Sequence, residues 1–222
     1  MTEPNTPSET TEVRGGGEIQ LRMEGEAIAI SGYAAVFDQR ADIVPGPGGM
    51  AEVIRPGAFA RALREGQDVD LLVAHAGLPL ARSSSGTLTL SEDATGLRIE
   101  ATLDSADPDV ARLAPKLRRG DLRHMSFGFR AVRQSWQQEE GDRMLRSLED
   151  LDLREVSVVA RPAYGGTSVA LRSAEAARAA ASTGFDGASP RALQEAGHRR
   201  RTLQLAEAHH AGTHQGTARE RP

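Results

Sequence analysis

Short apolar runs with a period of two dominate the middle of the chain. In AIAISGYAAVF (27–37) and GLRIEATL (96–103), apolar side chains alternate with polar or small ones, and glycine, proline or aspartate ends most such runs. This spacing is typical of half-buried β-strands. It predicts strands at 27–37, 51–54, 69–75, 86–90, 96–103, 124–133, 143–149 and 151–159.

Two segments between these runs have helical signals. One is PGAFARALRE (56–65), and the other covers 108–118, where Asp107 and Pro108 suit the N-cap and the first helical position and Gly120 suits the end. Many short strands with two inserted helices predict an α+β fold that is mainly β. We expect a β-barrel or a strongly bent sheet with flanking helices.

The chain divides into three zones by composition. Residues 1–17 are rich in Thr, Glu, Pro and Gly with little to bury, which predicts a disordered N-terminal arm. Residues 18–172 hold nearly all the aromatic and β-branched side chains and form the predicted domain. Residues 173–222 are rich in alanine and arginine and cannot build a core, so we expect a helical or disordered tail.

The composition excludes several classes of protein. The 222 residues include no cysteine, so disulfide frameworks, cysteine-bearing zinc sites and cysteine nucleophiles are excluded. No run approaches the roughly 20 apolar residues that span a bilayer, and the N-terminal sequence lacks the order of a signal peptide. The net charge of −4 gives no long-range attraction to nucleic acid. We therefore expect a cytoplasmic protein with neither membrane nor nucleic acid as its partner.

Motifs for cofactors and metals are missing from the predicted domain. There is no GxSxG elbow, no HExxH and no cluster of residues with metal-ligand spacing. The loop VPGPGG (44–49) lacks the Lys-Ser/Thr of a phosphate-binding loop and contains two prolines. The sequence thus predicts neither a cofactor nor a metal site.

His75 is the first candidate for chemistry, because the domain contains only one other histidine, His124. His75 ends the run VDLLVAH, and on a strand its side chain would share the apolar face of Val69, Leu71 and Val73. An inward imidazole at the end of a strand suits a general base. A histidine satisfied within the core or at its rim is the ordinary alternative.

Ser126 is a small hydroxyl residue among bulky apolar neighbours in HMSFGF (124–129). Gly128 would point to the same face and leave open space beside the hydroxyl, where a substrate backbone could approach. These features suit a nucleophile. A buried serine without a catalytic role fits the same pattern.

Glu155 interrupts an apolar stripe. On a regular strand it would share a face with Leu151, Leu153, Ser157 and Val159. A buried carboxylate needs a cationic or hydrogen-bonding partner, and a histidine that becomes charged during turnover would serve. An ordinary salt bridge to an arginine is the alternative. One serine, one histidine and one acid in a single domain are together the components of nucleophilic acyl transfer.

Five sequence blocks then resemble, in order and spacing, the prohead (capsid maturation) protease family of tailed bacteriophages. They are ISGYAAVFD (30–38), VIRPGAFARAL (53–63), VDLLVAH (69–75), MSFGF (125–129) and LREVSVVARPAY (153–164). The resemblance covers about 20–172 and implies a fold related to the herpesvirus assemblin proteases, a β-barrel surrounded by helices.

The resemblance also implies a function. Members are serine endopeptidases without a cofactor that act inside the assembling procapsid, in the cytoplasm of the bacterial host. They cleave scaffold protein or the scaffolding arm of the major capsid protein, and often themselves, and we expect a homo-oligomer. By position, the family's histidine corresponds to His75 and its nucleophile to Ser126, and Glu155 is our choice for the third catalytic residue.

Three alternatives remain open from the sequence. The herpesvirus enzymes use a second histidine as third member, which makes His124 a rival to Glu155, although it lies about 6–7 Å along a strand from Ser126. A catalytically silent barrel that binds scaffold or capsid protein is the main alternative function. An esterase or peptidase unrelated to viruses is the third.

Overall fold

The computed structural model describes residues 11–24 and 27–161 of the chain. Their strands are β1 (Glu12–Glu24), β2 (Ala27–Val36), β3 (Ala41–Val44), β4 (Met50–Ile54), β5 (Asp70–Val73), β6 (Ala76–Arg82), β7 (Leu88–Glu92), β8 (Gly96–Leu103), β9 (His124–Glu139) and β10 (Arg143–Val159). The α-helices are α1 (Ala60–Arg64) and α2 (Pro108–Arg119), and a 3-10 turn, Glu140–Asp142, joins β9 to β10.

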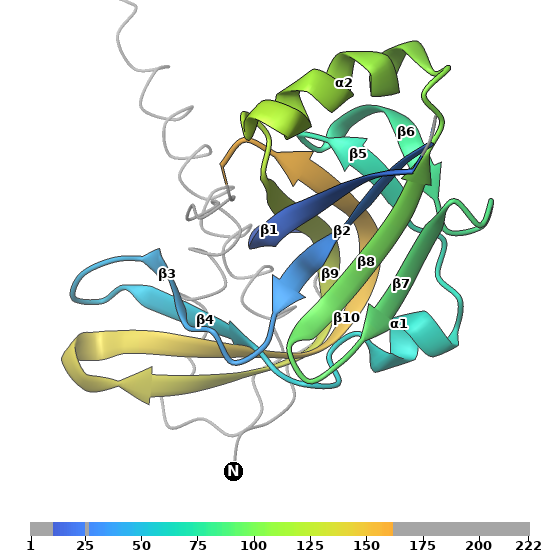
Figure 1. The fold of residues 1–222 in the computed structure, drawn as a ribbon. Helices are drawn as coiled ribbons and strands as arrows, with labels where there is room; N and C mark the ends of the chain where they lie inside the picture. The colour runs from blue at the N-terminus through green and yellow to red at the C-terminus, as the bar shows by residue number, and fades with distance from the viewer. Residues whose placement is uncertain (1–10, 25–26, 162–222) are drawn as a thin grey trace, which may run out of the picture. The chain divides into compact units, whose positions relative to one another are not determined.

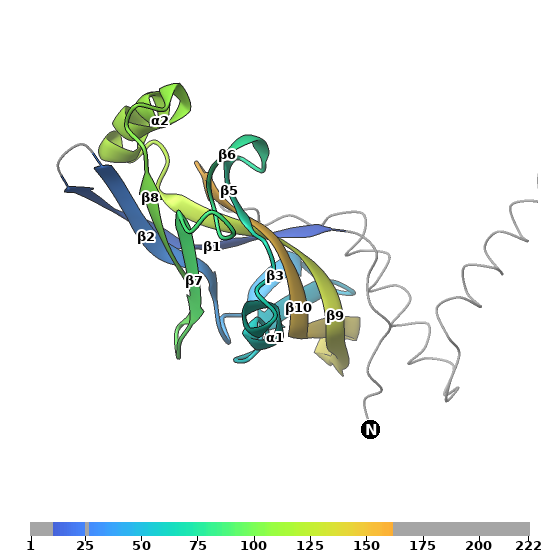
Figure 2. The ribbon, with the colours of Figure 1, turned by 90° about the vertical axis from the view of Figure 1, so that its right-hand side faces the viewer.

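The strands form one mixed sheet in the order β3-β4-β10-β9-β1-β2-β8-β7 (Figure 1). The long strand β10 pairs antiparallel with β9 along one side. Along its other side it pairs in parallel with β4 at one end and β5 at the other, and β6 pairs with β5. The path does not close, so among the described residues the mainly-β fold is a bent open sheet and not the barrel we also expected (Figure 2).

The sheet bends at β1. Residues 12–15 of β1 pair with β9, whereas residues 19–24 pair with β2, and the register shifts between Gly15 and Glu18. Gly16 lies at this corner, where a Cβ atom would overlap the carbonyl of Ala34. A glycine is therefore required for the two parts of the sheet to approach so closely.

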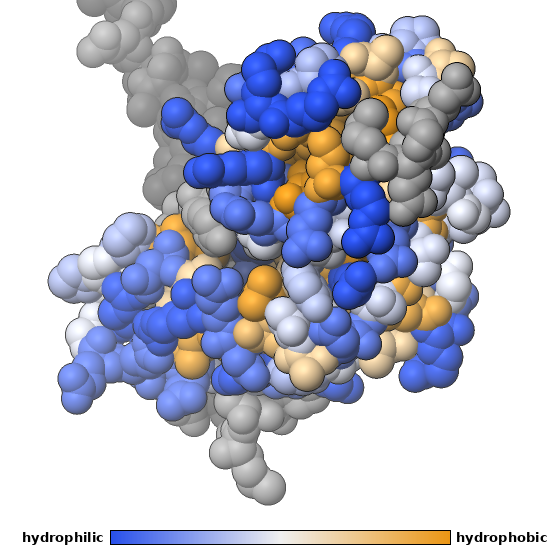
Figure 3. Space-filling model, viewed as in Figure 1, coloured by the Kyte–Doolittle hydropathy of each residue, from blue (hydrophilic) through white to orange (hydrophobic). Residues whose placement is uncertain are grey.

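The core lies on the concave side of this sheet. Four phenylalanines form its centre through successive ring contacts, with centroid separations of 6.2 Å for Phe37–Phe59, 5.5 Å for Phe59–Phe127 and 5.1 Å for Phe127–Phe129. Aliphatic side chains from β2, β8, β10 and α2 pack around them. In Figure 3 apolar side chains come to the surface beneath α2, whereas the region of β3 and β4 is mainly hydrophilic.

The two helices differ in how well they follow their sequence signals. In α2 the Asp107 carboxylate accepts the N–H of Asp109 at 2.8 Å, and Gly120 ends the helix in the left-handed region, as predicted. α1 is shorter than expected, because Gly57 has a φ of +87° and the helix begins only after it. Neither helix is long and apolar enough to cross a membrane.

The described residues correct the predicted N-terminal arm. β1 begins at Glu12, within the stretch 1–17 that we expected to be disordered. Residues 12–17 are polar and glycine-rich, but Glu12 and Arg14 are buried and form ion pairs there. Hydrophobic patterning does not detect burial of this kind. Residues 1–10 and the predicted tail, 173–222, lie outside the described residues.

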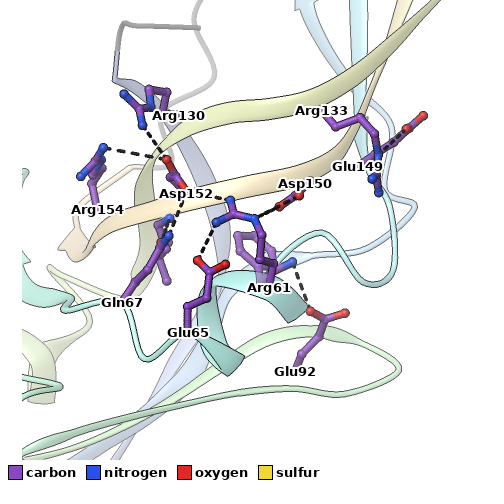
Figure 4. A network of polar contacts seen from close by, with 12 residues as sticks. Arg61, Glu65, Gln67, Glu92, Arg130, Arg133, Glu149, Asp150, Asp152 and Arg154 are labelled. Carbon is purple, nitrogen blue, oxygen red and sulfur yellow. Dashed lines mark hydrogen bonds and ion pairs between the residues drawn. The ribbon is translucent and has the colours of Figure 1, made fainter. Parts of the chain in front are cut away.

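A polar network fixes α1 and the segment after it to β10 (Figure 4). Asp152 of β10 accepts hydrogen bonds from Arg61 at 2.7 Å, from Gln67 at 2.9 Å and from Arg130 at 2.7 Å. The amide oxygen of Gln67 also accepts the N–H of Leu153 at 2.9 Å. Because Gln67 lies three residues before β5, this network holds the segment that leads into β5 against β10.

The Asp152 network makes stability depend on pH. Burial alone would raise the pKa of Asp152, but the hydrogen bonds from Arg61, Arg130 and Gln67 outweigh it and hold the pKa well below its usual value. A carboxyl with a lowered folded-state pKa stabilises the fold above its unfolded pKa of about 3.9, and this contribution is lost as the pH falls.

We expect Asp152→Asn to lower the free energy of unfolding by roughly 2 kcal/mol at neutral pH, a typical loss for a charged hydrogen-bond acceptor. As the pH falls below about 3.9 the parent progressively loses the same contribution, so the difference between the two proteins should be smaller at about pH 3 than at neutral pH. Urea unfolding of both proteins at the two pH values measures the difference. A difference that stays constant with pH would contradict this account.

Candidate active site

The candidate site lies on one face of the β9–β10 ladder. Ser126 lies directly opposite Ser157, and Gly128 directly opposite Glu155. Residues opposite each other on antiparallel strands point to the same face, so these four share one side, which we call the site face. The other side, the core face, carries Phe127 opposite Val156.

A β-bulge at Arg154 places Glu155 on the site face. Leu153 pairs with Phe129 and Glu155 with the adjacent residue, Gly128, so the register shifts between them. The extra residue reverses the alternation. The prediction that Glu155 and Ser157 share a face with Leu151 and Leu153 was therefore wrong, because both leucines lie in the core.

His75 lies in a turn and not on a strand. β5 ends at Val73, and Ala74 and His75 form a two-residue turn into β6, with φ angles of +52° and +61°. Two successive positive φ values are those of a type I′ hairpin turn. The predicted position of His75 on the apolar face of the strand was thus wrong, and the turn instead directs the imidazole to the site face.

His75 and Glu155 form a close pair. Nδ1 of His75 lies 2.7 Å from Oε1 of Glu155, and both side chains are largely buried. Because a carboxylate only accepts, this contact places a proton on Nδ1, and in the neutral imidazole Nε2 is then the acceptor. Within the described part of the chain, Nε2 is buried and has no hydrogen-bond partner. The imidazole is therefore prepared to receive a proton from a third group.

Ser157 links this pair to the strand, and sequence reasoning missed it. Its hydroxyl donates to Oε2 of Glu155 at 2.7 Å and accepts the backbone N–H of His75 at 3.0 Å. The N–H of Ala74 bonds the carbonyl of Val158 at 3.0 Å, so two hydrogen bonds fix the turn to β10. The period of two that places Ser157 beside Glu155 was the available signal.

Gly128 has a different role from the one that we expected. A Cβ atom at this position would overlap Oε1 of Glu155. The space beside Gly128 is therefore filled by the carboxylate and is not open for a substrate backbone.

Ser126 is fully buried, with 0% of its surface exposed. Its hydroxyl donates to the carbonyl oxygen of Arg14 at 2.7 Å, across the β1–β9 ladder in which Gly15 lies opposite Ser126. The hydroxyl is thus directed toward β1 and not toward His75. It belongs nevertheless to the same face as the His75–Glu155 pair: β10, which carries Glu155, is the strand next to β9, and the turn that carries His75 follows β5 on the other side of β10.

His124, the rival third member, begins β9 opposite Val159. Its Nε2 lies 3.3 Å from Nε of Arg123. The side chain that contacts the His75 imidazole is therefore that of Glu155 and not that of His124.

Among the described residues, no group of three or more His, Asp or Glu side chains is placed to hold a metal ion.

A groove of about 240 Å³ opens beside the turn that carries His75. Val73 and Ala76, which flank the turn, line it together with Leu78, Leu80, Leu122 and residues of α2. Leu78 is 78% exposed. The strand side of the groove is therefore mainly apolar, whereas α2 contributes the charged side chains of Asp109, Arg112 and Lys116.

Comparison with protein families gives a match over residues 18–181 to the caudovirus prohead serine proteases. The chain belongs to this family. The match confirms the resemblance drawn from the five sequence blocks. Comparisons with curated proteins and with solved structures gave no match, so the expected relation to herpesvirus assemblin remains a prediction.

The range shared with the prohead serine proteases contains the whole His75–Glu155 pair and Ser126. It begins at residue 18, after the first half of β1. The strand segment that contacts the Ser126 hydroxyl therefore lies outside the matched range.

Proposed function

We propose that this prohead protease is a serine endopeptidase in which Ser126 is the nucleophile, His75 the general base and Glu155 the residue that orients and stabilises the imidazole. The observation that supports it best is the His75–Glu155 pair, whose Nε2 is buried and unpartnered on the face that carries Ser126. Family membership gives the reaction class.

The proposed reaction begins with a rotation of Ser126 about its Cα–Cβ bond, from the Arg14 carbonyl toward Nε2 of His75. Oγ attacks the scissile carbonyl carbon while Nε2 takes the hydroxyl proton. The C–N bond then breaks, and the proton passes from His75 to the leaving amine. Water releases the acyl group by the same steps, and Glu155 stabilises the charged imidazole throughout.

The proposed substrate is scaffold protein or the scaffolding arm of the major capsid protein, cleaved inside the procapsid, together with the enzyme's own chain. The apolar groove beside His75 would receive apolar side chains of that substrate.

The competing function, a silent domain that only binds scaffold or capsid protein, is favoured by one observation: the Ser126 hydroxyl is buried and engaged by Arg14.

A fluorophosphonate probe distinguishes the two functions, because it forms a P–O bond to an activated serine oxygen and releases fluoride. We expect the full-length protein to be labelled at Ser126, located by peptide mass spectrometry. Ser126→Ala should remain unlabelled, and His75→Gln should react much more slowly. Labelling at another residue would contradict the assignment, and no labelling with intact binding to capsid or scaffold protein would support the silent domain.

A further inference from the structure

Among the described residues, Ser157 is the one polar side chain with a hydrogen bond to each member of the His75–Glu155 pair, to the carboxylate of Glu155 and to the backbone of His75. We propose that Ser157 is a positioning residue: it fixes the Glu155 carboxylate and the His75 turn in the geometry that proton transfer requires. This inference rests on the proposed function for its effect on catalysis.

The directions of its hydrogen bonds are determined by chemistry. A hydroxyl has one proton, and the carboxylate oxygen Oε2 of Glu155 can only accept it. The lone pairs of Ser157 Oγ therefore remain for the N–H of His75, at 3.0 Å. With Oε2 held by Ser157, the other oxygen, Oε1, is directed to Nδ1 of His75.

Gly128 limits the carboxylate from the opposite strand. Because a side chain there would overlap Oε1, only glycine lets Glu155 lie against β9. Ser157 on one side and Gly128 on the other thus confine the carboxylate to a single orientation.

The turn that carries His75 needs such restraint. Its two non-glycine residues have positive φ angles, each of which is unfavourable for a residue with a Cβ atom. In the described contacts three hydrogen bonds connect the turn to β10: the N–H of Ala74 to the carbonyl of Val158, the N–H of His75 to Ser157, and Nδ1 of His75 to Glu155. Removing the Ser157 hydroxyl takes away the hydrogen bond to the backbone of His75 and the one that orients the Glu155 carboxylate.

Ser157 is fully buried beneath the His75–Glu155 pair, so we expect it to make no contact with substrate. Ser157→Ala should therefore lower kcat by about 10- to 100-fold, the range for misplacing a catalytic group by up to about 1 Å, with KM unchanged. Ser157→Thr keeps the hydroxyl and should restore most of the lost kcat.

The test combines kinetics with proton NMR of the full-length protein. In the parent, the Nδ1 proton of His75, which is hydrogen-bonded to Oε1 of Glu155, should give a far-downfield resonance. The absence of this resonance in His75→Gln would assign it. Ser157→Ala should lose or broaden this signal, and Ser157→Thr should retain it. Ser147→Ala is the matched control, since Ser147 also lies on β10 opposite a serine, Ser135, but far from His75; it should change neither signal nor kcat.

The outcomes separate this inference from the proposed function. An unchanged downfield signal and unchanged kcat in Ser157→Ala would overturn the positioning role. A lower melting temperature with kcat unchanged per folded molecule would also overturn it, because a purely structural residue behaves in that way. If the parent has no protease activity, the proposed function fails, yet the NMR signal in Ser157→Ala still decides whether Ser157 positions the pair.

Discussion

Ser126→Ala is expected to lower the rate of peptide-bond cleavage at least roughly a thousandfold, the order of loss when a serine nucleophile is removed. The fold should tolerate the change. Ser126 is buried on the site face, and its loss removes one hydrogen bond, to the Arg14 carbonyl, worth about 1 kcal/mol. A large loss of activity with a small loss of stability is what distinguishes a nucleophile from a structural serine.

The measurement is cleavage of the capsid and scaffold proteins encoded by the same phage, followed by intact-mass spectrometry. The mass of the enzyme itself, compared between the parent and Ser126→Ala, reports self-processing. Ser135→Ala is the control on the same strand, because its hydroxyl donates to Glu149 at 2.6 Å, far from His75. Equal cleavage rates in the parent and Ser126→Ala would remove Ser126 from the mechanism.

Arg146→Met is expected to cause the largest loss of stability, about 3–5 kcal/mol, as for other buried ion pairs that lose one partner. Arg146 is fully buried and donates to both oxygens of Glu12 at 2.6 and 2.8 Å, to Glu52 at 2.9 Å and to Gln134 at 2.6 Å. Burial alone would raise the pKa of Glu12, but Arg146 and Arg14 hold it below its usual value. Without Arg146, two buried carboxylates face a single guanidinium, that of Arg14.

Urea unfolding of two further variants tests this charge balance. Arg143→Met, on the same strand, removes an arginine whose partner Asp42 is exposed, and should cost less than about 1 kcal/mol. The double variant Arg146→Met with Glu12→Gln removes one charge of each sign, so it should be more stable than the sum of the single changes predicts. Strict additivity would show that the four charges do not act as one network.

The sequence predicted those elements whose apolar positions recur regularly or whose ends have clear capping residues. β8 matches its predicted range, and α2 begins and ends at the residues that its Asp107 and Gly120 signals indicate. β1 was missed because its buried residues near the N-terminus are charged. Glu12 and Arg14 look like a solvated segment in isolation, and only their partners on β4 and β10 make burial favourable.

The identities of the candidate residues came from the sequence, but their geometry did not. Pattern analysis singled out His75, Ser126 and Glu155, and the structure pairs two of them. The turn at His75 was hidden because the pair Ala74-His75 is not one of the Asn-Gly, Asp-Gly or Gly-Gly pairs that signal a type I′ turn. The interactions of Ser157 and Ser126 depend on strands distant in the chain, which no local pattern specifies.

The bulge at Arg154 has a consequence for which substitutions the site should tolerate. The side chain of Arg154 is exposed and does not contact the imidazole, so many amino acids could replace it. Its backbone, however, supplies the extra residue that lets Leu153 and Glu155, two positions apart, point to opposite faces; if residue 154 were paired regularly, Glu155 would share the core face of Leu153. The face that the acid occupies is therefore decided by how β10 pairs with β9 at this point and not by which side chain position 154 carries.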